Sequence, residues 1–427
     1  MLRLVLCLLS VLCISPSLYA WSNHFLFYHA ALEVLPEVAN TPKIKVESLE
    51  DFLLKEQKGL VEEMAKMENE VKTTYAKYAP QPEALAFKGG DKKTIRENFL
   101  RALRVNPKTP FGFFLQELPG NKLPGAAANS LSASMFGDKD IKDKYALYDI
   151  RNGQSVDALE VLATAGDEPD FGMDINLFVD NEGPLGKDYG FGTQSFGNPK
   201  LYFGTQAPFH IGYYHESWII FKAGSFLKRT YPKYRVHQYL TLARFAFKTG
   251  HPYWGYRFLG WGLHYIGDLT QPYHARVLPN NSTLRMLWIN IKAMLGFEAS
   301  KIAAIEDVSD RHLTLERYHF SVLRDAYVKH NLNHPFIQSV KVTQKDAGYG
   351  AYNADYIENV LTQESYGISD ELDTLIDKSN LLKGFVDGKV TAEVNAPALK
   401  ELDALIATHM QGIGAHVRNY VRAGIMK

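Results

Sequence analysis

Helical periodicity in the second half of this 427-residue chain restricts its fold more than any other sequence feature. From about residue 213 onward, apolar residues recur at the three- and four-residue spacing of amphipathic helices. No clear strand pattern and no internal repeat interrupts this periodicity. The chain is therefore expected to form an all-α, multi-helix bundle. The expected helices span residues 233–249, 253–268, 284–303, 309–328, 353–363, 367–379 and 397–424.

The first half of the chain mixes helices with long loops. Helical patterning is expected over residues 23–38, 47–78 and 93–104, whereas Pro, Gly and Ser residues punctuate the chain from 80 to 155. Between residues 166 and 209, Gly, Asp and aromatic residues dominate, which is typical of loops. Hydrophobic residues make up 46% of the chain, enough to bury a substantial core.

The first twenty residues, MLRLVLCLLSVLCISPSLYA, have the pattern of a secretory signal peptide. A short apolar run is followed by Ser, Pro and the small residue Ala20, so the mature protein is expected to begin at Trp21 and to be secreted or periplasmic. The two cysteines, Cys7 and Cys13, lie in this segment, and the mature chain would have no disulfide. A new α-amino group at Trp21, with a pKa of about 7.7–8.0, could bind a metal ion cheaply near neutral pH.

Charge is balanced over the chain, with 47 basic and 47 acidic residues. No global positive field exists to attract nucleic acid or an anionic membrane. Any such partner must therefore be bound by local groups.

The stretch LHYIGDLTQPYHA, residues 263–275, concentrates metal-binding side chains. His264 and Asp268 are four residues apart, so on a helix both project from one face. Pro272 ends that helix, and the turn returns His274 toward the same face. Farther along, His312 and Glu316 repeat the four-residue spacing. Nitrogen and carboxylate ligands without thiolate favour zinc at an open, catalytic site, and manganese or iron also fits this ligand type.

Several motifs together resemble the zinc-dependent phospholipases C, which are relatives of the S1/P1 nucleases. They are Trp21 directly after the signal peptide, His24 in the first helix, Pro169-Asp170-Phe171, HYIGDLTQPYH and HLTLE, and the stretch 241–268 is also similar in pattern. The resemblance implies an α-helical bundle with three zinc ions in a cleft. On this basis residues 21–427 are expected to form one zinc-dependent hydrolase domain with insertions near 40–160 and 276–305.

The resemblance also implies which residues bind each ion. One zinc would be held by Asp170, His210, His264 and Asp268, and Asp268 would bridge to a second zinc held by Trp21 and His24. A third would be held by His274, His312 and Glu316. Two positions have alternatives in the sequence, because His215 competes with His210 and Asp167 competes with Asp170. His210 and Asp170 are preferred for their flanking residues.

Such a cluster implies phosphodiester hydrolysis, with Asp170 orienting or deprotonating the attacking water. The HxxxE spacing of His312 and Glu316, together with the missing cysteines, favours the phospholipase branch over the nucleases. The expected substrate is a glycerophospholipid in a bilayer or micelle, phosphatidylcholine foremost, with aromatic residues from 189 to 214 facing the choline. One alternative is an S1/P1-type nuclease or 3′-nucleotidase, and another is an exported non-catalytic protein stapled by zinc.

The segment LRMLWINIKAMLGF, residues 284–297, is strongly apolar and carries Arg285 and Lys292. Two hypotheses account for it: an interfacial helix that contacts lipid beside the cleft, or a helix of the core. The last hundred residues are expected to be helical, without a β domain for membrane binding. The sequence leaves the head-group preference and the oligomeric state open.

Overall fold

The protein folds mainly into helices. The computed structural model describes residues 23–75, 77–137, 141–142 and 144–425, so the expected signal peptide and Trp21 lie outside the described residues. Helices account for 60% of the structure and strands for 4%, with no closed sheet in its described part, and the expected all-α class is confirmed. No helix in those ranges is long and apolar enough to cross a membrane.

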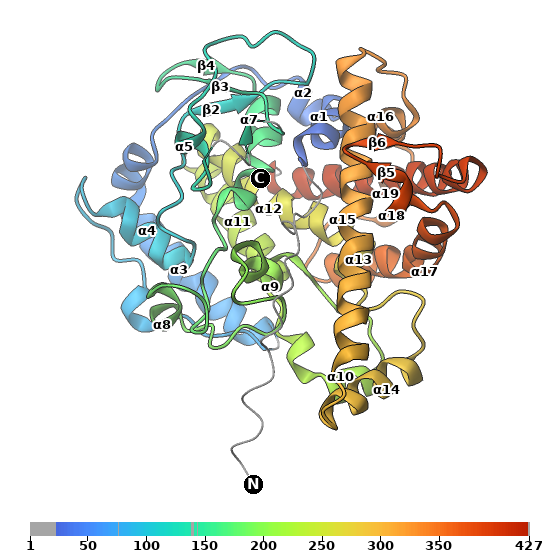
Figure 1. Ribbon diagram of the computed structural model, residues 1–427. Helices are drawn as coiled ribbons and strands as arrows, with labels where there is room; N and C mark the ends of the chain where they lie inside the picture. The colour runs from blue at the N-terminus through green and yellow to red at the C-terminus, as the bar shows by residue number, and fades with distance from the viewer. Residues whose placement is uncertain (1–22, 76, 138–140, 143, 426–427) are drawn as a thin grey trace.

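Helix α12 (Pro252–Leu269) lies at the centre of the structure. Every residue from Tyr253 to Leu269 is buried, because the helix is hydrophobic on all sides and is covered by neighbours. The helices packed against it are α7 (Ala158–Ala165), α11 (Pro232–Lys248) and α19 (Ala396–Ile425) (Figure 1).

Glycines on α12 allow these neighbours to approach closely. A Cβ added at Gly260 would lie 2.6 Å from the carbonyl oxygen of Leu162 on α7, and one at Gly262 would lie 1.9 Å from the Tyr420 hydroxyl on α19. At Gly267, beside Asp268, an added Cβ would lie 2.1 Å from the Tyr28 hydroxyl on α1 (Phe25–Glu33). Close helix packing thus brings α1 to the end of α12 that carries Asp268.

Helix α15 (Ala299–Val328) extends along one side of the molecule, with α14 (Thr283–Met294) at its lower end in Figure 1. The remaining α-helices are α2 (Pro36–Ala39), α3 (Leu49–Thr74), α4 (Ile95–Leu103), α5 (Ser130–Ala133), α8 (Leu185–Tyr189), α9 (Ala207–His210), α10 (Trp218–Ala223), α13 (Pro272–Ala275), α16 (Pro335–Val340), α17 (Thr362–Lys378) and α18 (Leu381–Gly384). Short 3-10 helices are η1 (Glu83–Leu85), η2 (Glu168–Phe171), η3 (Tyr202–Gln206), η4 (Ser225–Lys228) and η5 (Ala347–Tyr349), and η6 (Ile357–Leu361) is a π-helix.

In the described part of the chain, six short strands form three antiparallel pairs that the sequence did not predict. They pair as β1 (Ile44–Lys45) with β4 (Ser155–Val156), β2 (Phe114–Gln116) with β3 (Leu147–Asp149), and β5 (Phe385–Val386) with β6 (Lys389–Val390). Each strand has two or three residues, which is too short for a two-residue periodicity to stand out.

Three expected helix boundaries are wrong. The helix expected over 284–303 is two helices, because the chain turns at Gly296, whose φ is +91°, a left-handed conformation that favours glycine. The helix expected over 23–38 breaks before Pro36, whose ring excludes a helical hydrogen bond. The two helices expected over 353–363 and 367–379 are continuous, since η6 leads directly into α17.

Candidate metal centre

Eight of the nine expected metal ligands lie close together at the end of α12, and the ninth, Trp21, is outside the described residues. Their ligand atoms form three neighbouring sets. We call Asp170, His210, His264 and Asp268 the inner group, His24 with Asp268 the N-terminal group, and His274, His312 and Glu316 the outer group. All eight side chains are buried.

Local structure positions each ligand. The Pro169 turn of η2 carries Asp170, and the last residue of α9 is His210. His264 and Asp268 are one turn apart on α12, as their spacing predicts. Gln271 ends that helix with an extended backbone and its side chain accepts a hydrogen bond from the N–H of Tyr273, so α13 begins in a new direction and carries His274.

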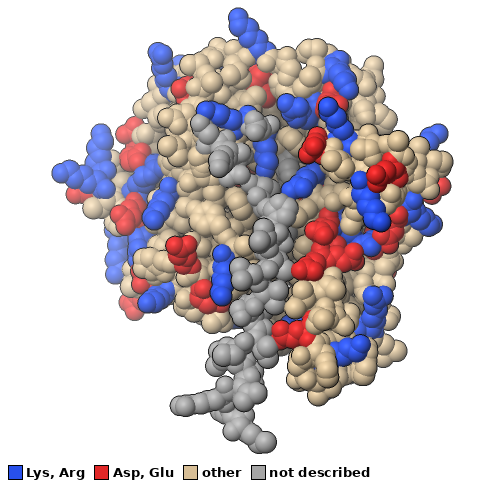
Figure 2. Space-filling model, viewed as in Figure 1, with Lys and Arg blue, Asp and Glu red and all other residues tan. Residues whose placement is uncertain are grey.

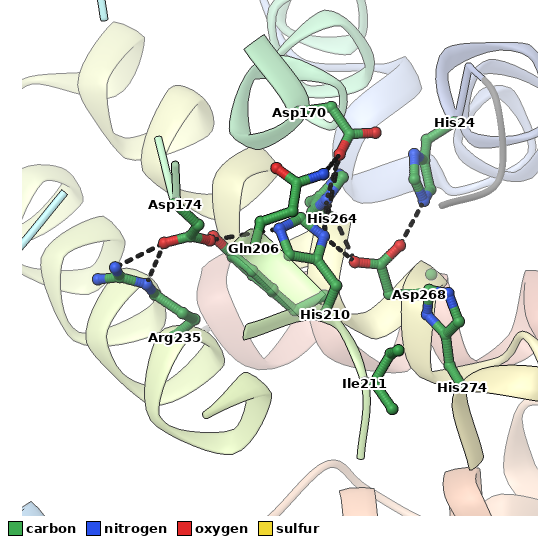
Figure 3. Close-up of polar contacts among 12 residues, drawn as sticks. His24, Asp170, Asp174, Gln206, His210, Ile211, Arg235, His264, Asp268 and His274 are labelled. Atoms are coloured by element: carbon green, nitrogen blue, oxygen red, sulfur yellow. Dashed lines mark hydrogen bonds and ion pairs between the residues drawn. The ribbon is translucent and has the colours of Figure 1, made fainter. Parts of the chain in front are cut away.

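Five ligand-to-ligand distances in the inner group are close to those of a tetrahedral site. His210 Nδ1 lies 3.1 Å from His264 Nε2 and 2.7 Å from Asp268 Oδ2, and His264 Nε2 lies 3.2 Å from the same oxygen. Asp170 Oδ1 lies 3.9 Å from His210 Nδ1 and 3.7 Å from His264 Nε2 (Figure 3). Ligands about 2.0–2.2 Å from a tetrahedral zinc ion are roughly 3.4 Å apart, within this range.

Asp268 belongs to two groups at once. Its Oδ2 faces the inner group, whereas its Oδ1 points the other way and lies 3.3 Å from His24 Nε2 (Figure 3). A carboxylate has two oxygens and can therefore serve two cations. This orientation is the one required of a bridging ligand.

The outer group joins α13 to α15. His274 Nε2 and His312 Nε2 are 3.1 Å apart, and His312 Nε2 lies 2.6 Å from Glu316 Oε1. The Gln271 amide donates to the same Glu316 oxygen over 3.3 Å. Since His312 and Glu316 are one turn apart on α15, both face α13 together.

Unpartnered buried atoms favour a bound cation in these groups. Within the described ranges, Asp170 Oδ2 and Glu316 Oε2 are buried and have no hydrogen-bond partner. Asp268 Oδ1 and both ring nitrogens of His24 also lack a hydrogen bond and have only ion-pair contacts of 3.3–3.4 Å. Leaving such atoms without a partner is unfavourable, and a metal ion would satisfy them. Several buried clusters of His, Asp and Glu could thus hold a metal ion, and their nitrogen and oxygen donors fit zinc.

Electrostatics in the inner group are strongly perturbed. Burial lowers the pKa of His210, but the charge of Asp268 and its contacts with Asp174 and Asp268 outweigh burial and raise it to about 10. Burial raises the pKa of Asp268, yet His264 and His210 bring it well below its usual range. For Asp170, burial dominates over His264 and His210 and raises the pKa. Cation binding to such groups displaces protons, which couples metal affinity to pH.

A second layer of side chains orients the ligands. The other ring nitrogen of His210, Nε2, lies 3.4 Å from Asp174 Oδ2, and Arg235 Nη2 donates to Asp174 Oδ1 over 2.6 Å (Figure 3). His264 Nδ1 lies 2.8 Å from the carbonyl oxygen of Gly166, so this nitrogen donates and Nε2 remains available. Contacts of this kind fix the ring orientation of metal-binding histidines.

Sequence analysis did not identify this second layer. Asp174, Arg235, Gln206 and Gln271 come from separate segments, and Gln206 donates its amide to Asp170 Oδ1 over 3.3 Å. The sequence offered one indication of Asp174, because this second aspartate of DFGMD follows Asp170 by four residues.

The competing residues occupy other positions. Asp167 accepts hydrogen bonds from the backbone N–H of His24 over 2.6 Å and of Phe25 over 3.3 Å, so it caps α1. Its Oδ1 also lies 3.4 Å from His24 Nδ1. His215 is only partly buried and pairs with Thr362 Oγ1 at 3.1 Å, apart from all three groups.

Three of the eight aromatic residues from 189 to 214 are in the core, and the other five are partly buried or exposed. Tyr189, Phe191 and Phe209 are buried, and the last two contact each other edge to face. These three rings present no face to a choline cation, whereas Phe196, Tyr202, Phe203, Tyr213 and Tyr214 keep part of their surface accessible, so the expected contact with choline stays a prediction.

Comparisons with models of known protein families, with curated proteins and with solved structures give no match to this chain.

Proposed function

We propose that this protein is a zinc-dependent phospholipase C, with a bundle of the phospholipase C/P1 nuclease type and three zinc ions. The observation that carries the proposal is Asp268, which presents one oxygen to the inner group and the other to His24. A structural zinc site closes four protein ligands around one ion, whereas adjoining groups that share a carboxylate are typical of multinuclear hydrolases.

The ligand assignment follows the three groups. Asp170, His210, His264 and Asp268 would hold the first ion, and His24 with Asp268 and the expected N-terminus at Trp21 would hold the second. His274, His312 and Glu316 would hold the third. When bound, zinc supplies an activated water near neutral pH and positive charge for a phosphoryl group.

Asp170 is the residue we assign to proton transfer. Its Oδ1 faces the inner group and accepts the Gln206 amide, so its Oδ2 remains without a partner among the described residues. Burial raises its pKa, which increases its affinity for a proton. A carboxylate with one oxygen engaged and the other free can orient an attacking water and accept its proton.

The substrate assignment rests on two features of the chain. Glu316 occupies the position that is usually aspartate in the nuclease branch, and no cysteine follows Cys13. Both favour a glycerophospholipid, cleaved on the glycerol side of phosphorus to diacylglycerol and a phosphorylated head group. We further propose that the protein acts outside the cytoplasm after removal of residues 1–20.

The test uses purified protein that begins at Trp21. Its zinc content is measured by elemental analysis, and phosphocholine release from phosphatidylcholine is compared with nucleotide release from single-stranded DNA. We expect close to three zinc ions per chain and phosphocholine release. Zinc with nucleotide release alone would replace the phospholipase by a nuclease, zinc without either activity would indicate a non-catalytic protein, and absent zinc would overturn the whole proposal.

An Asp170→Asn variant tests the role of that carboxylate. The amide keeps one oxygen for the inner group and cannot accept a proton, so we expect a loss of at least a hundredfold in kcat with two or more zinc ions retained. The matched control is Asp180→Asn, because this aspartate lies in the same connecting segment and only accepts a loop N–H of Gln194. Full activity of the zinc-loaded Asp170 variant would refute the assignment.

A further inference from the structure

Large apolar side chains are exposed at one end of the molecule. Eight of the sixteen exposed large apolar residues in the described ranges belong to two short segments, residues 218–228 and 284–297. The most exposed include Leu284 and Met294 at 79% and Trp218 at 71%. We call the eight residues the apolar face: Trp218, Phe226, Leu284, Trp288, Ile291, Met294, Leu295 and Phe297. Such a concentration marks an interaction surface.

Of the two hypotheses for residues 284–297, a helix buried in the core does not fit the structure, because only one side of α14 is buried. Met286 and Ala293 are seven residues apart and buried on one side, where Met286 packs with Ile220 and Leu227 of α10 and η4. Leu284, Trp288 and Ile291 follow the i, i+4, i+7 spacing of the opposite side and are exposed. Packing within the chain is thus satisfied by one side of α14, and the other side remains open.

The charge of the same segments is entirely positive. Residues 218–228 contain Lys222 and Lys228, residues 284–297 contain Arg285 and Lys292, and neither segment contains an acidic residue, with Glu216 and Glu298 lying just outside them. The whole chain, by contrast, has equal numbers of acidic and basic residues. In Figure 2 the lobe where Figure 1 places α10 and α14 is mostly tan, with basic side chains on its right and acidic ones at its left edge.

The basic side chains lie beside the apolar face. On α14, Arg285 and Lys292 are seven residues apart and form a stripe between the exposed and the buried side. The Lys292 ammonium lies 5.5 Å from the centre of the Trp288 ring, and the Lys228 ammonium lies 4.6 Å from that of Phe221. Long basic side chains next to Trp, Leu and Met are the composition of a helix that lies in a lipid interface.

The apolar face is connected to the metal centre by short stretches of chain. Val277 and Leu278 pack with the α10 and α14 core, three and four residues after His274. On the other side, α15 begins at Ala299 and reaches His312 after thirteen residues, a distance of about 20 Å along the helix. A surface bound at the apolar face would therefore lie within reach of the outer group.

We propose that the apolar face binds a bilayer that contains anionic lipid, with α14 lying in the plane of the interface. The apolar side chains enter the acyl boundary and the four basic residues of the two segments contact anionic head groups. This inference rests on the proposed phospholipase function in one respect: that function explains why lipid binding is useful, because it brings the metal centre to its substrate. Binding itself requires no hydrolysis.

The experiment measures binding of the full mature, metal-loaded protein to vesicles of phosphatidylcholine with 30% phosphatidylglycerol, and phosphocholine release is followed in the same samples. We compare the wild type with Trp288→Asp/Met294→Asp by flotation. The matched control is Leu131→Asp/Leu332→Asp, which changes two exposed leucines elsewhere, at 64% and 49% exposure. We expect at least a tenfold loss of vesicle affinity for the first variant and less than twofold for the control.

A charge variant tests the anionic component. Arg285→Glu/Lys292→Glu should lose at least tenfold in affinity for the anionic vesicles, whereas Lys43→Glu/Lys329→Glu, at two other exposed lysines, should lose less than twofold. Wild-type binding should also fall with added salt and on pure phosphatidylcholine vesicles. Equal binding of all variants would overturn the proposal. It would also be overturned if the wild type is a dimer and the Trp288→Asp/Met294→Asp variant is a monomer with unchanged vesicle binding, because the apolar face would then be a dimer interface.

The two proposals fail separately. Vesicle binding without phosphocholine release would support the proposal that the apolar face binds lipid and would contradict the proposed phospholipase activity. Conversely, if the Trp288→Asp/Met294→Asp variant loses the same activity on bilayers and on monomeric short-chain phosphatidylcholine, the apolar face has no role in lipid approach. We expect a tenfold or greater loss on bilayers and less than twofold on the short-chain lipid.

Discussion

Asp167 links the start of a helix to a metal ligand. One of its oxygens accepts the backbone N–H of His24 and also lies 3.4 Å from His24 Nδ1, while the other accepts the amide of Gln116 over 2.6 Å. We expect Asp167→Asn to weaken metal binding at the N-terminal group by 10- to 100-fold, because the charge behind the imidazole is lost. Competition of the protein with a chelating dye for zinc measures this affinity.

A control at another helix N-cap separates the effect of Asp167→Asn on zinc affinity from its effect on stability. Asp167→Asn also loses acceptors for α1 and should reduce the free energy of unfolding by about 1–2 kcal/mol. Ser48, whose side chain caps α3 by accepting from the Asp51 N–H, provides the control. Ser48→Ala should cost about 1 kcal/mol and leave zinc affinity unchanged. If both variants bind zinc equally well, Asp167 only caps α1.

His319 should make the stability of the protein dependent on pH. Burial, aided by His409, His24 and His334, lowers its pKa to about 3, compared with 6.5 in the unfolded chain. Between these two values the unfolded state binds a proton that the folded state does not, so stability present above pH 6.5 is lost as pH falls toward 3, by about 1.4 kcal/mol per pH unit. The free energy of unfolding of the chelated wild type and of His319→Gln is measured with urea at several values from pH 7 to pH 4.5. Plotted against pH, it should fall less steeply for the variant, by the equivalent of one proton.

The residues that sequence analysis could find are those with local spacing. His264 with Asp268, and His312 with Glu316, are predictable because one helical turn fixes their relative direction. By contrast, Asp174 and Arg235 meet through the packing of a loop on α11, and no periodicity links positions 61 residues apart. The same limit explains why sequence alone left Asp167 and Asp170 as alternatives. Their distinct contacts depend on where α1 lies.

At the scale of the helix, Gly267 controls how closely α1 approaches α12. An added Cβ would lie 2.1 Å from the Tyr28 hydroxyl and 2.8 Å from His24 Cδ2, so Gly267→Ala must push α1 away and separate His24 from Asp268. We expect a loss of about 1–3 kcal/mol in the free energy of unfolding, together with weaker zinc binding. Chemical denaturation and zinc titration measure the two effects.

Gly367 on α17 is the matched control for that substitution. An added Cβ there meets no atom within 4 Å, and the residue is exposed in a helix. Gly367→Ala should stabilise the protein by up to about 1 kcal/mol, because alanine has the higher helix propensity, and should leave zinc binding unchanged. Similar losses in both variants would mean that the contact between α1 and α12 does not limit the site.

Helix boundaries show how far periodicity reaches at this scale. Helices α11 and α12 lie within one or two residues of their expected bounds, because Pro232, Gly250 and Pro252 mark the ends chemically. The break between α14 and α15 was missed, since apolar residues continue across it to Phe297 and the left-handed Gly296 is a single position. The sequence also left open whether the apolar residues of α14 are exposed or buried, because apolar residues occur both in cores and on interaction surfaces.

For the whole molecule, metal ions would connect parts of the chain that nothing covalent joins. The ligands span residues 24 to 316 on α1, η2, α9, α12, α13 and α15, and the two cysteines, Cys7 and Cys13, both precede them. Removal of the cations would leave the carboxylates of Asp170, Asp268 and Glu316 buried with unpartnered oxygens. Chelation should therefore weaken the whole bundle as well as the site.

We expect removal of all three proposed zinc ions to lower the thermal midpoint of unfolding by more than 10 °C, since each ion present at a thousand times its Kd stabilises by about 4 kcal/mol and a chain of this size shifts by roughly 1 °C per kcal/mol. Calorimetry of zinc-loaded and chelated protein measures the change, and added zinc should restore the midpoint while magnesium should not, because imidazole ligands do not suit magnesium. Replacing both His312 and Glu316, as His312→Asn/Glu316→Gln, removes the outer group and should reduce the effect of chelation by about a third. An unchanged midpoint after complete removal of metal would show that packing alone holds these six elements together.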